Sequence, residues 1–201
     1  VLCCASVEHF APKHVPEGTG WVTAEYSMLP RANRERSRRD IDKLKLSGRS
    51  AEIQRLIGRS LRAAVDREAL GERTITVDCD VLQGDGGTRT ASVTGGFVAL
   101  ALACRKLMAE GKVTKDPIIH QVAAVSAGIV DDVPLLDLPY AEDSRAQVDL
   151  NCVMNEKGEL IELQGTGEGR SFTLSEQQEL VRLCAKGIGE LLEKQRRVLQ
   201  G

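Results

Sequence analysis

The chain has 201 residues, 42% of them hydrophobic and 28% charged, so it is long enough to bury a compact core. Its formal net charge of −2 excludes a strongly basic domain that would bind nucleic acid through its total charge. Any contact with a polyanion must therefore come from local basic patches.

The apolar residues predict strands that alternate with helices along the chain. Period-two runs rich in β-branched residues indicate strands, and apolar residues three and four apart indicate helices. Three helices and about seven strands indicate an α+β or α/β sheet protein. The last helix is expected to start at Ser175 as its N-cap, with Glu176 and Glu179 in its first turns. The expected strands are 1–7, 20–29, 74–82, 121–130, 133–138, 146–154 and 160–164, and the other helices are 50–66 and about 91–108.

The chain shows no low-complexity tract, linker or repeat, and we expect a single domain over residues 1–201. Its longest apolar run, around 98–104, is soon followed by two basic residues, whereas a membrane-spanning helix needs ~20 apolar residues. We therefore expect no membrane partner. The chain opens on a strand-like pattern and not on Met, so we also expect that it begins inside its domain and lacks an N-terminal segment.

Cysteine and histidine usage disfavours a zinc site and a catalytic nucleophile. The six cysteines show no Cys-x-x-Cys spacing. Four of them lie in apolar runs, such as 76–82 and 98–107, and are expected to be reduced, buried thiols of a cytoplasmic protein. His9, His14 and His120 accompany no nucleophile motif and are expected to be structural or surface residues.

The strongest candidate for an anion site is the turn Asp85-Gly86-Gly87-Thr88-Arg89-Thr90. Glycines let the backbone turn tightly and expose consecutive N–H groups where a helix begins, and that end of a helix favours an anion. Thr88 adds a hydroxyl, and Arg89 adds a guanidinium suited to phosphate. The turn lacks the Gly-Lys-Ser/Thr ending of a P-loop. The alternative is that it only starts a helix, as most such turns do.

A second basic feature is segment 31–40, which carries five arginines and no aromatic residue. Such a segment can grip a nucleic-acid backbone without reading its bases, and the density of arginine favours RNA phosphates. The alternative is a solvated surface loop. The arginines are Arg31, Arg34, Arg36, Arg38 and Arg39.

Two shorter features remain open on the residues alone. Arg49 stands beside Gly48 and next to an expected helix, so this segment either completes an anion pocket or caps the helix. Residues 164–169 form a second glycine-rich turn, which either approaches the site or is plain turn chemistry.

The acidic candidates are Asp143 and Asp149, which are six residues apart. If Ser144 begins a bend or strand, this even spacing lets both carboxylates point to one face, where they can hold a Mg²⁺ that keeps several waters. Paired carboxylates near a bound phosphate also suit proton transfer to a leaving 3′-oxygen. The alternative is a set of turn acids and strand-end charges.

Several long stretches resemble the ribonuclease PH family. They are GWVTAEYSMLPR at 20–31, EIQRLIGRSLR at 52–62 and DCDVLQ at 78–83, which leads into GGTRT at 86–90. Residues 136–138, 142–144 and 164–166 belong to the same pattern in the same order. The resemblance thus spans nearly the whole chain.

The resemblance implies an α+β fold with the βαβα arrangement of the second domain of ribosomal protein S5, assembled as a ring of six made from three dimers. It also implies a phosphorolytic 3′-to-5′ exoribonuclease. Inorganic phosphate would remove nucleotides beyond the 3′ CCA end of transfer RNA precursors as nucleoside 5′-diphosphates, and the step would be reversible as a nucleotidyltransferase reaction.

The resemblance also assigns roles by position. Asp143 and Asp149 match the family's active-site carboxylates, which are expected to bind Mg²⁺. The arginines of segment 31–39 match residues that touch RNA across the ring. The residues that match the family's phosphate-binding positions are Arg49, Gly87, Thr88 and Arg89.

The main alternative is a ring subunit of an exosome-like assembly that binds RNA without catalysis. Such a subunit is expected to have lost Arg49, Arg89 or the two aspartates, and all four residues are present. A polynucleotide phosphorylase is disfavoured because it carries two such cores, and 201 residues hold only one.

Overall fold

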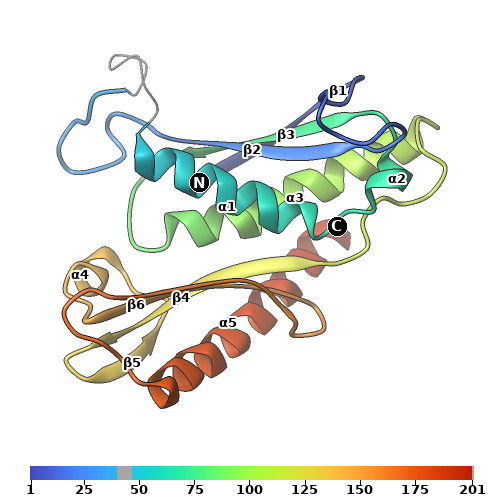
Figure 1. The fold of residues 1–201 in the computed structure, drawn as a ribbon. Coiled ribbons are helices and arrows are strands. Elements are labelled where there is room, and N and C mark those ends of the chain that lie inside the picture. Colours follow the sequence, from blue (N-terminus) through green and yellow to red (C-terminus); the bar gives the residue numbers. More distant parts are fainter. Residues whose placement is uncertain (40–46, 201) are drawn as a thin grey trace.

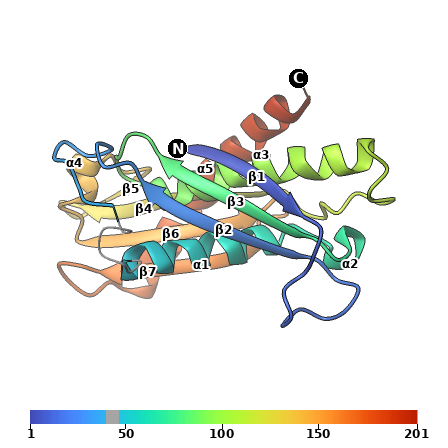
Figure 2. The same ribbon diagram turned by 90° about the horizontal axis from the view of Figure 1, so that it is seen from above.

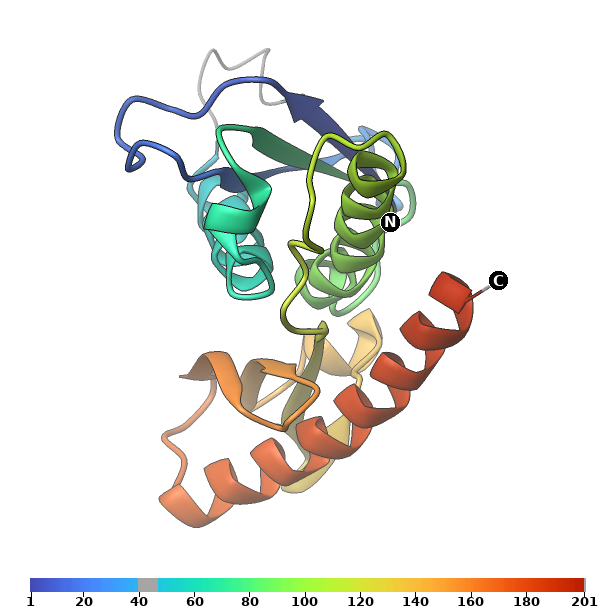
Figure 3. The same cartoon turned by 90° about the vertical axis from the view of Figure 1, so that its right-hand side faces the viewer.

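The computed structural model describes residues 1–39 and 47–200, in which two sheets alternate with helices (Figure 1). One sheet lies above helices α1 and α3, the second sheet lies beneath these helices, and α5 covers the far side of the second sheet (Figure 3). This is the α+β, βαβα arrangement that the family resemblance implied, and the expectation is confirmed.

The first sheet has the strand order β1-β3-β2, formed by β1 (Leu2–Glu8), β3 (Thr74–Val81) and β2 (Trp21–Met28). β1 is antiparallel to β3, whereas β2 is parallel to it. Parallel neighbours need a crossover connection, which here contains α1 (Gly48–Arg62) and the short α2 (Arg67–Leu70).

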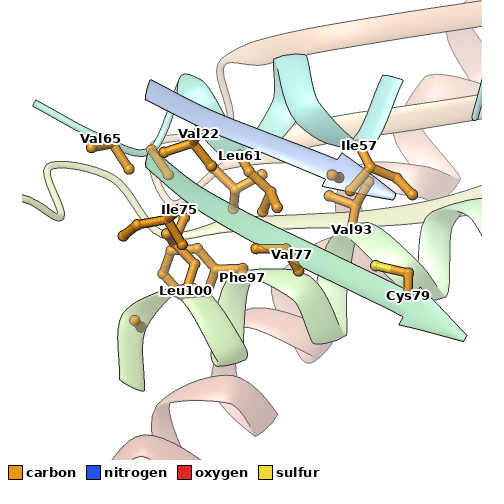
Figure 4. Close-up of a cluster of buried hydrophobic side chains, with 14 of the residues drawn as sticks. Val22, Ile57, Leu61, Val65, Ile75, Val77, Cys79, Val93, Phe97 and Leu100 are labelled. Atoms are coloured by element: carbon orange, nitrogen blue, oxygen red, sulfur yellow. The ribbon is translucent and has the colours of Figure 1, made fainter. Parts of the chain in front are cut away.

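The larger core lies between the first sheet and helices α1 and α3 (Thr88–Ala109) (Figure 4). Alternate residues of β3 point into it, because successive side chains of a strand lie on opposite faces. Apolar residues of α1 at helical spacing fill the same space. Core side chains include Val22, Ile57, Leu61, Ile75, Val77, Val93, Phe97 and Leu100.

The second sheet is antiparallel, with the order β5-β4-β6-β7. Its strands are β4 (Val122–Val130), β5 (Val133–Leu136), β6 (Val148–Asn155) and β7 (Leu160–Gly167). All nine residues of β4 are buried, because α3 covers one face of this strand and α5 (Leu174–Gln200) covers the other. The strand is therefore almost entirely apolar, with Ser126 as its one polar residue and no polar alternation.

Helix α3 corrects the expectation that no segment is long and apolar enough for a membrane. It has 22 residues and passes that test by length and composition. Core helices of soluble proteins pass it too, and α3 packs against both sheets and against α1 and α5. In the window that passes this test 44% is buried, so these contacts account for part of its apolar composition.

The seven predicted strands are all present, but several helix boundaries differ. α3 begins at Thr88, three residues before the predicted start. α5 is capped by Thr173 and not by Ser175, because the Thr173 Oγ1 accepts a hydrogen bond from the Glu176 N–H at 3.2 Å. The one-turn helices α2 and α4 (Tyr140–Asp143) were not predicted. α4 is joined to a distant residue, since the Asp85 carboxylate accepts from the Tyr140 N–H.

Four cysteines are buried as expected, namely Cys79, Cys104, Cys152 and Cys184, and all cysteines of the described chain are free. Asp40, the last residue of segment 31–40, lies outside the described residues. The single domain over residues 1–201 stays a prediction.

Candidate active site

The N-terminal ends of α1 and α3, the loop after β2 and the short α4 all lie at one end of the molecule (Figure 1, left). Seen from above, the same end also holds the end of β7 (Figure 2). The fold therefore gathers the segments that carry the predicted site residues.

The turn before α3 requires glycine at two positions. Gly87 has a left-handed φ of +72°, which side-chain-bearing residues rarely adopt. At Gly86, a Cβ would lie 1.9 Å from the backbone oxygen of Leu138. The close approach of these chains lets α3 begin directly at Thr88, and its first turn contains no acidic residue. This helix end is suited to an anion.

Thr88 is oriented by the neighbouring sheet. Its hydroxyl lies 2.8 Å from the hydroxyl of Tyr26 on β2. Tyr26 is opposite Cys79 in the register of β2 and β3, and its ring is buried in the core. The rigid tyrosine thus fixes the position of a side chain at the start of α3.

The side chain of Arg89 is mostly buried, with 19% of it exposed, and two residues hold it. Its Nη1 donates to Oε1 of Gln164 on β7 at 3.1 Å. The same nitrogen lies 3.5 Å from Oε2 of Glu52 on α1. Gln164 Nε2 in turn donates to Oε1 of Glu52 at 3.0 Å. Arg89, Glu52 and Gln164 therefore form a closed triangle, which we call the Arg89 triangle.

Asp143 and Asp149 lie close enough to act on each other electrostatically, but they do not lie on one strand. Asp143 ends helix α4, whereas Asp149 lies on β6. The even spacing of the two residues along one strand is therefore not what brings their carboxylates together. Burial raises the pKa of Asp149, and the negative charge of Asp143 raises it further. Arg89 and a hydrogen bond from the Asn151 amide at 2.9 Å oppose this rise. The structure thus brings Arg89 and both aspartates into one electrostatic cluster.

Asp85 links the glycine turn to the acidic helix. Its carboxylate accepts from the backbone N–H groups of Gly86 and Tyr140, and these bonds lower its pKa. Tyr140 begins α4, which carries Asp143. The anion-suited turn and one of the aspartates are therefore held together by a residue that sequence reasoning had only counted as part of the turn.

Arg49 is the second residue of α1 and is exposed. It lies one helical turn before Glu52, so the two are near neighbours on the helix surface. The side chain of Ser47 caps α1 by accepting from the Ser50 N–H at 3.0 Å. The segment thus caps the helix through Ser47, and the exposed Arg49 lies in the first turn of α1. Its part in an anion pocket stays a prediction.

The predicted RNA-binding arginines lie in the loop after β2. Among the described residues, none of these arginines is hydrogen-bonded to the glycine turn. All five are exposed. The base of the loop is fixed beside the turn, because the Gly84 N–H donates to the Ala32 oxygen at 2.7 Å. The arginine loop therefore leaves the sheet close to the predicted phosphate site.

Sequence reasoning gave no role to Glu52, Tyr26 or Asn151. Glu52 and Gln164 are 112 residues apart, so no local motif signals their contact. Gln164 was noted as part of a glycine-rich turn and of the family pattern, but it was given no role. A hollow of about 290 Å³ runs along α1 beside Glu52 and is also lined by Gly48, Ala51, Arg55 and Arg59.

The described residues contain no group of three or more His, Cys, Asp and Glu side chains arranged to hold a metal ion. Two carboxylates remain at the site, and their mutual repulsion is of the kind that a divalent cation relieves. Two carboxylates with several waters suit Mg²⁺, which dehydrates reluctantly. The donor set therefore fits a Mg²⁺ that is only partly coordinated by protein.

Solved structures with the same fold include a rice protein and an archaeal exosome. The crystal structure of rice (Oryza sativa) Rrp46 has a TM-score of 0.74 at 14% identity and covers 98% of this chain and 83% of its own. The Archaeoglobus fulgidus exosome with RNA bound to the active site has a TM-score of 0.78 at 19% identity, covering 96% and 77%. At these identities the likeness shows the fold alone.

Closer relatives come from the curated proteins. Ribonuclease PH from two strains of Neisseria gonorrhoeae, NCCP11945 and ATCC 700825 / FA 1090, is 57% identical over 200 residues, or 99% of this chain and 83% of the relative. The models of domain 1 and domain 2 of the 3′ exoribonuclease family match residues 1–106 and 120–186. The chain therefore belongs to the 3′ exoribonuclease family, within its ribonuclease PH group of phosphate-dependent enzymes.

Proposed function

We propose that this phosphorolytic 3′-to-5′ exoribonuclease trims the 3′ ends of transfer RNA precursors and releases nucleoside 5′-diphosphates. The observation that carries the proposal is the meeting of Arg89, the uncapped N-terminus of α3 and the Asp143–Asp149 pair at one end of the molecule. The non-catalytic alternative is disfavoured, because the relatives at 57% identity are ribonuclease PH enzymes and the likeness to exosome subunits is below 25% identity.

In the proposed reaction, an oxygen of inorganic phosphate attacks the phosphorus of the terminal phosphodiester. Gly87 and Thr88, at the start of α3, would hold the phosphate with Arg89 and Arg49. The two arginines offset the repulsion between the phosphate and the anionic RNA end, and they hold the phosphate beside the phosphorus that it attacks. The bond to the 3′-oxygen of the preceding nucleotide breaks, and that oxygen takes up a proton.

Asp143 and Asp149 would hold a Mg²⁺ ion at the same place. The bound ion would neutralise charge on the phosphoryl oxygens. Because one phosphate linkage replaces another, the same residues would also catalyse addition of nucleotides from diphosphates. The donor set of two carboxylates supports this proposal, and Asn151 keeps the Asp149 carboxylate in place.

The arginine loop would bind phosphates of the RNA upstream of its 3′ end. The enzyme would act as a homohexamer built as a trimer of dimers, and it would be located in the cytoplasm. The exposure of all five arginines beside the glycine turn supports an RNA-binding role. A loop that holds phosphates gives affinity with little sequence preference. The preference for transfer RNA would then come from the shape of the folded RNA.

Competition between RNAs tests the substrate. The chain is incubated with phosphate, Mg²⁺ and equal amounts of a 3′-extended transfer RNA and an unstructured RNA of the same length. We expect the transfer RNA to be shortened to its CCA end and to accumulate there. Equal shortening of both RNAs, with no stop at CCA, would contradict transfer RNA as the preferred substrate.

A further inference from the structure

We propose that Glu52 and Gln164 are positioning residues that hold the Arg89 guanidinium in its phosphate-binding orientation. The proposal rests on the proposed role of Arg89 in binding phosphate. Its starting point is the Arg89 triangle, in which each of the three side chains contacts the other two.

The presence of a carboxylate beside an anion site needs an explanation. On its own, Glu52 would repel phosphate and weaken its binding. Arg89 is mostly buried, however, and a buried cation is costly unless it is paired and hydrogen-bonded. Glu52 supplies the compensating charge, so we infer that its benefit to the orientation of Arg89 exceeds its repulsion of phosphate.

The geometry of Gln164 specifies the orientation. Its amide oxygen accepts from Arg89, and its amide nitrogen donates to Glu52. These two bonds fix which way the amide faces. A guanidinium has five N–H donors in one plane, and the triangle contacts a single terminal nitrogen, Nη1. The other donors remain for a bidentate contact with phosphate.

The triangle also joins three separate elements at the site. Glu52 lies on α1, Arg89 on α3 and Gln164 on β7. Gln164 pairs in register with Asn151 of β6, whose amide holds Asp149. The orientation of Arg89 is thereby tied to the strand that carries the catalytic carboxylate, because neighbouring residues in register lie on the same face of a sheet.

A second ion pair on the same two elements provides a matched control. Glu162 lies two residues before Gln164 on β7, and its carboxylate accepts two hydrogen bonds from Arg59 of α1, at 2.9 and 3.1 Å. This pair joins α1 to β7 as the triangle does, but it does not include Arg89. Loss of Glu162 therefore tests the effect of loosening α1 from β7 alone.

The test measures kcat, the KM for inorganic phosphate at saturating RNA, the KM for RNA at saturating phosphate, and the melting temperature. The variants are Glu52→Ala, Glu52→Gln, Gln164→Ala and Glu162→Ala. We expect Glu52→Ala and Gln164→Ala to raise the phosphate KM about tenfold, with a smaller change in the KM for RNA. Glu52→Gln keeps an acceptor at the same place and should recover part of the loss. Glu162→Ala should stay within about twofold of the unchanged enzyme.

Arg89→Ala separates this proposal from the proposed function. If Arg89→Ala leaves the phosphate KM unchanged, the phosphate-binding role of Arg89 is wrong. If Arg89→Ala raises it and neither Glu52→Ala nor Gln164→Ala does, the positioning role is wrong. Adding Glu52→Ala to Arg89→Ala should raise the KM little further, because Glu52 acts through Arg89. A phosphate KM that falls in Glu52→Ala would also overturn the proposal. If Glu52→Ala does not fold, Gln164→Ala decides the same question.

Discussion

A guanidinium that is four-fifths buried needs acceptors around it, and at Arg89 they come from α1 and β7. The sequence predicted Arg89 itself, because a glycine turn before a helix and an adjacent arginine are local features. It could not predict Glu52 and Gln164 as the acceptors, since they are 112 residues apart and meet only through the packing of α1 against β7.

The two aspartates show the same limit at the scale of residues. Their residue type predicts a metal-binding or proton-transferring pair, which stays a prediction, and the structure shows that the charge of Asp143 raises the pKa of Asp149. The placement of Asp143 on a short helix was not predictable, because the Tyr140 N–H at the start of α4 is hydrogen-bonded by the distant Asp85 carboxylate. A one-turn helix has too few residues to show an apolar period.

Replacing three arginines of the loop, Arg34, Arg36 and Arg38, by alanine tests the RNA contact. We expect RNA binding to weaken and its dependence on salt to become shallower, by roughly one in the log–log slope for each phosphate that the loop no longer neutralises. The phosphate KM should not change. Binding is measured by titration of a labelled RNA at several salt concentrations.

An unchanged salt slope in that triple variant would show that the loop is only a solvated surface loop. Replacing Arg182 of α5 by alanine is a suitable control, because this exposed arginine is paired with Glu179 on the same helix, away from the predicted site.

At the scale of elements, the first turn of α5 is held by a reciprocal cap. Thr173 Oγ1 accepts from the Glu176 N–H, and the Glu176 carboxylate accepts from the Thr173 N–H. The helix was predicted from its apolar period, but the cap was placed two residues too late. Serine and threonine are both good N-caps, so the residue type of Ser175 was not a sufficient reason to place the cap there.

The cap predicts a pH dependence of stability. A hydrogen bond from Arg170 and the Thr173 N–H lower the pKa of Glu176 to about 2. Because the unfolded value is about 4.3, the ionised Glu176 stabilises the folded chain above that pH, and this stabilisation is lost as pH falls towards 2. The difference in melting temperature between the unchanged chain and Glu176→Gln should therefore be largest near neutral pH and smallest near pH 2. A constant difference over this range would contradict the assignment.

A buried glutamine, Gln195, joins α5 to α3 and β4. Gln195 is 3% exposed, and its amide nitrogen donates to the backbone oxygens of Thr94 and Val122 at 2.8 and 3.0 Å. Replacing it by leucine would leave buried acceptors unsatisfied, at a cost of roughly 1–3 kcal/mol in the free energy of unfolding. Urea denaturation measures this loss.

Gln178→Leu on the exposed side of α5 serves as the control and should change the free energy of unfolding by less than about 0.5 kcal/mol. An equally small loss for Gln195→Leu would show that its hydrogen bonds contribute little to the docking of α5.

At the scale of the whole molecule, the order of strands and helices was predictable, because each element carries its own period. The stacking of α3 between two sheets was not predicted, because the family resemblance gave only the βαβα arrangement. The absence of polar alternation in β4, whose one polar residue is Ser126, is explained by this stacking, since both faces of the strand are covered.

The proposed hexamer predicts a particle of six chains of 21.8 kDa each. Light scattering behind a sizing column measures this mass directly. A monomer that retains the full rate of phosphorolysis would contradict the need for a ring.

The central claim is that inorganic phosphate, held at Arg89, attacks the RNA end. Its most direct test follows ³²P-labelled phosphate during shortening of an RNA with a 3′ extension, in the unchanged chain and in Arg89→Ala. We predict that the label appears in nucleoside 5′-diphosphates with the unchanged chain and that its incorporation falls at least about a hundredfold in Arg89→Ala. Shortening that releases unlabelled nucleoside monophosphates, or proceeds without phosphate, would contradict the claim.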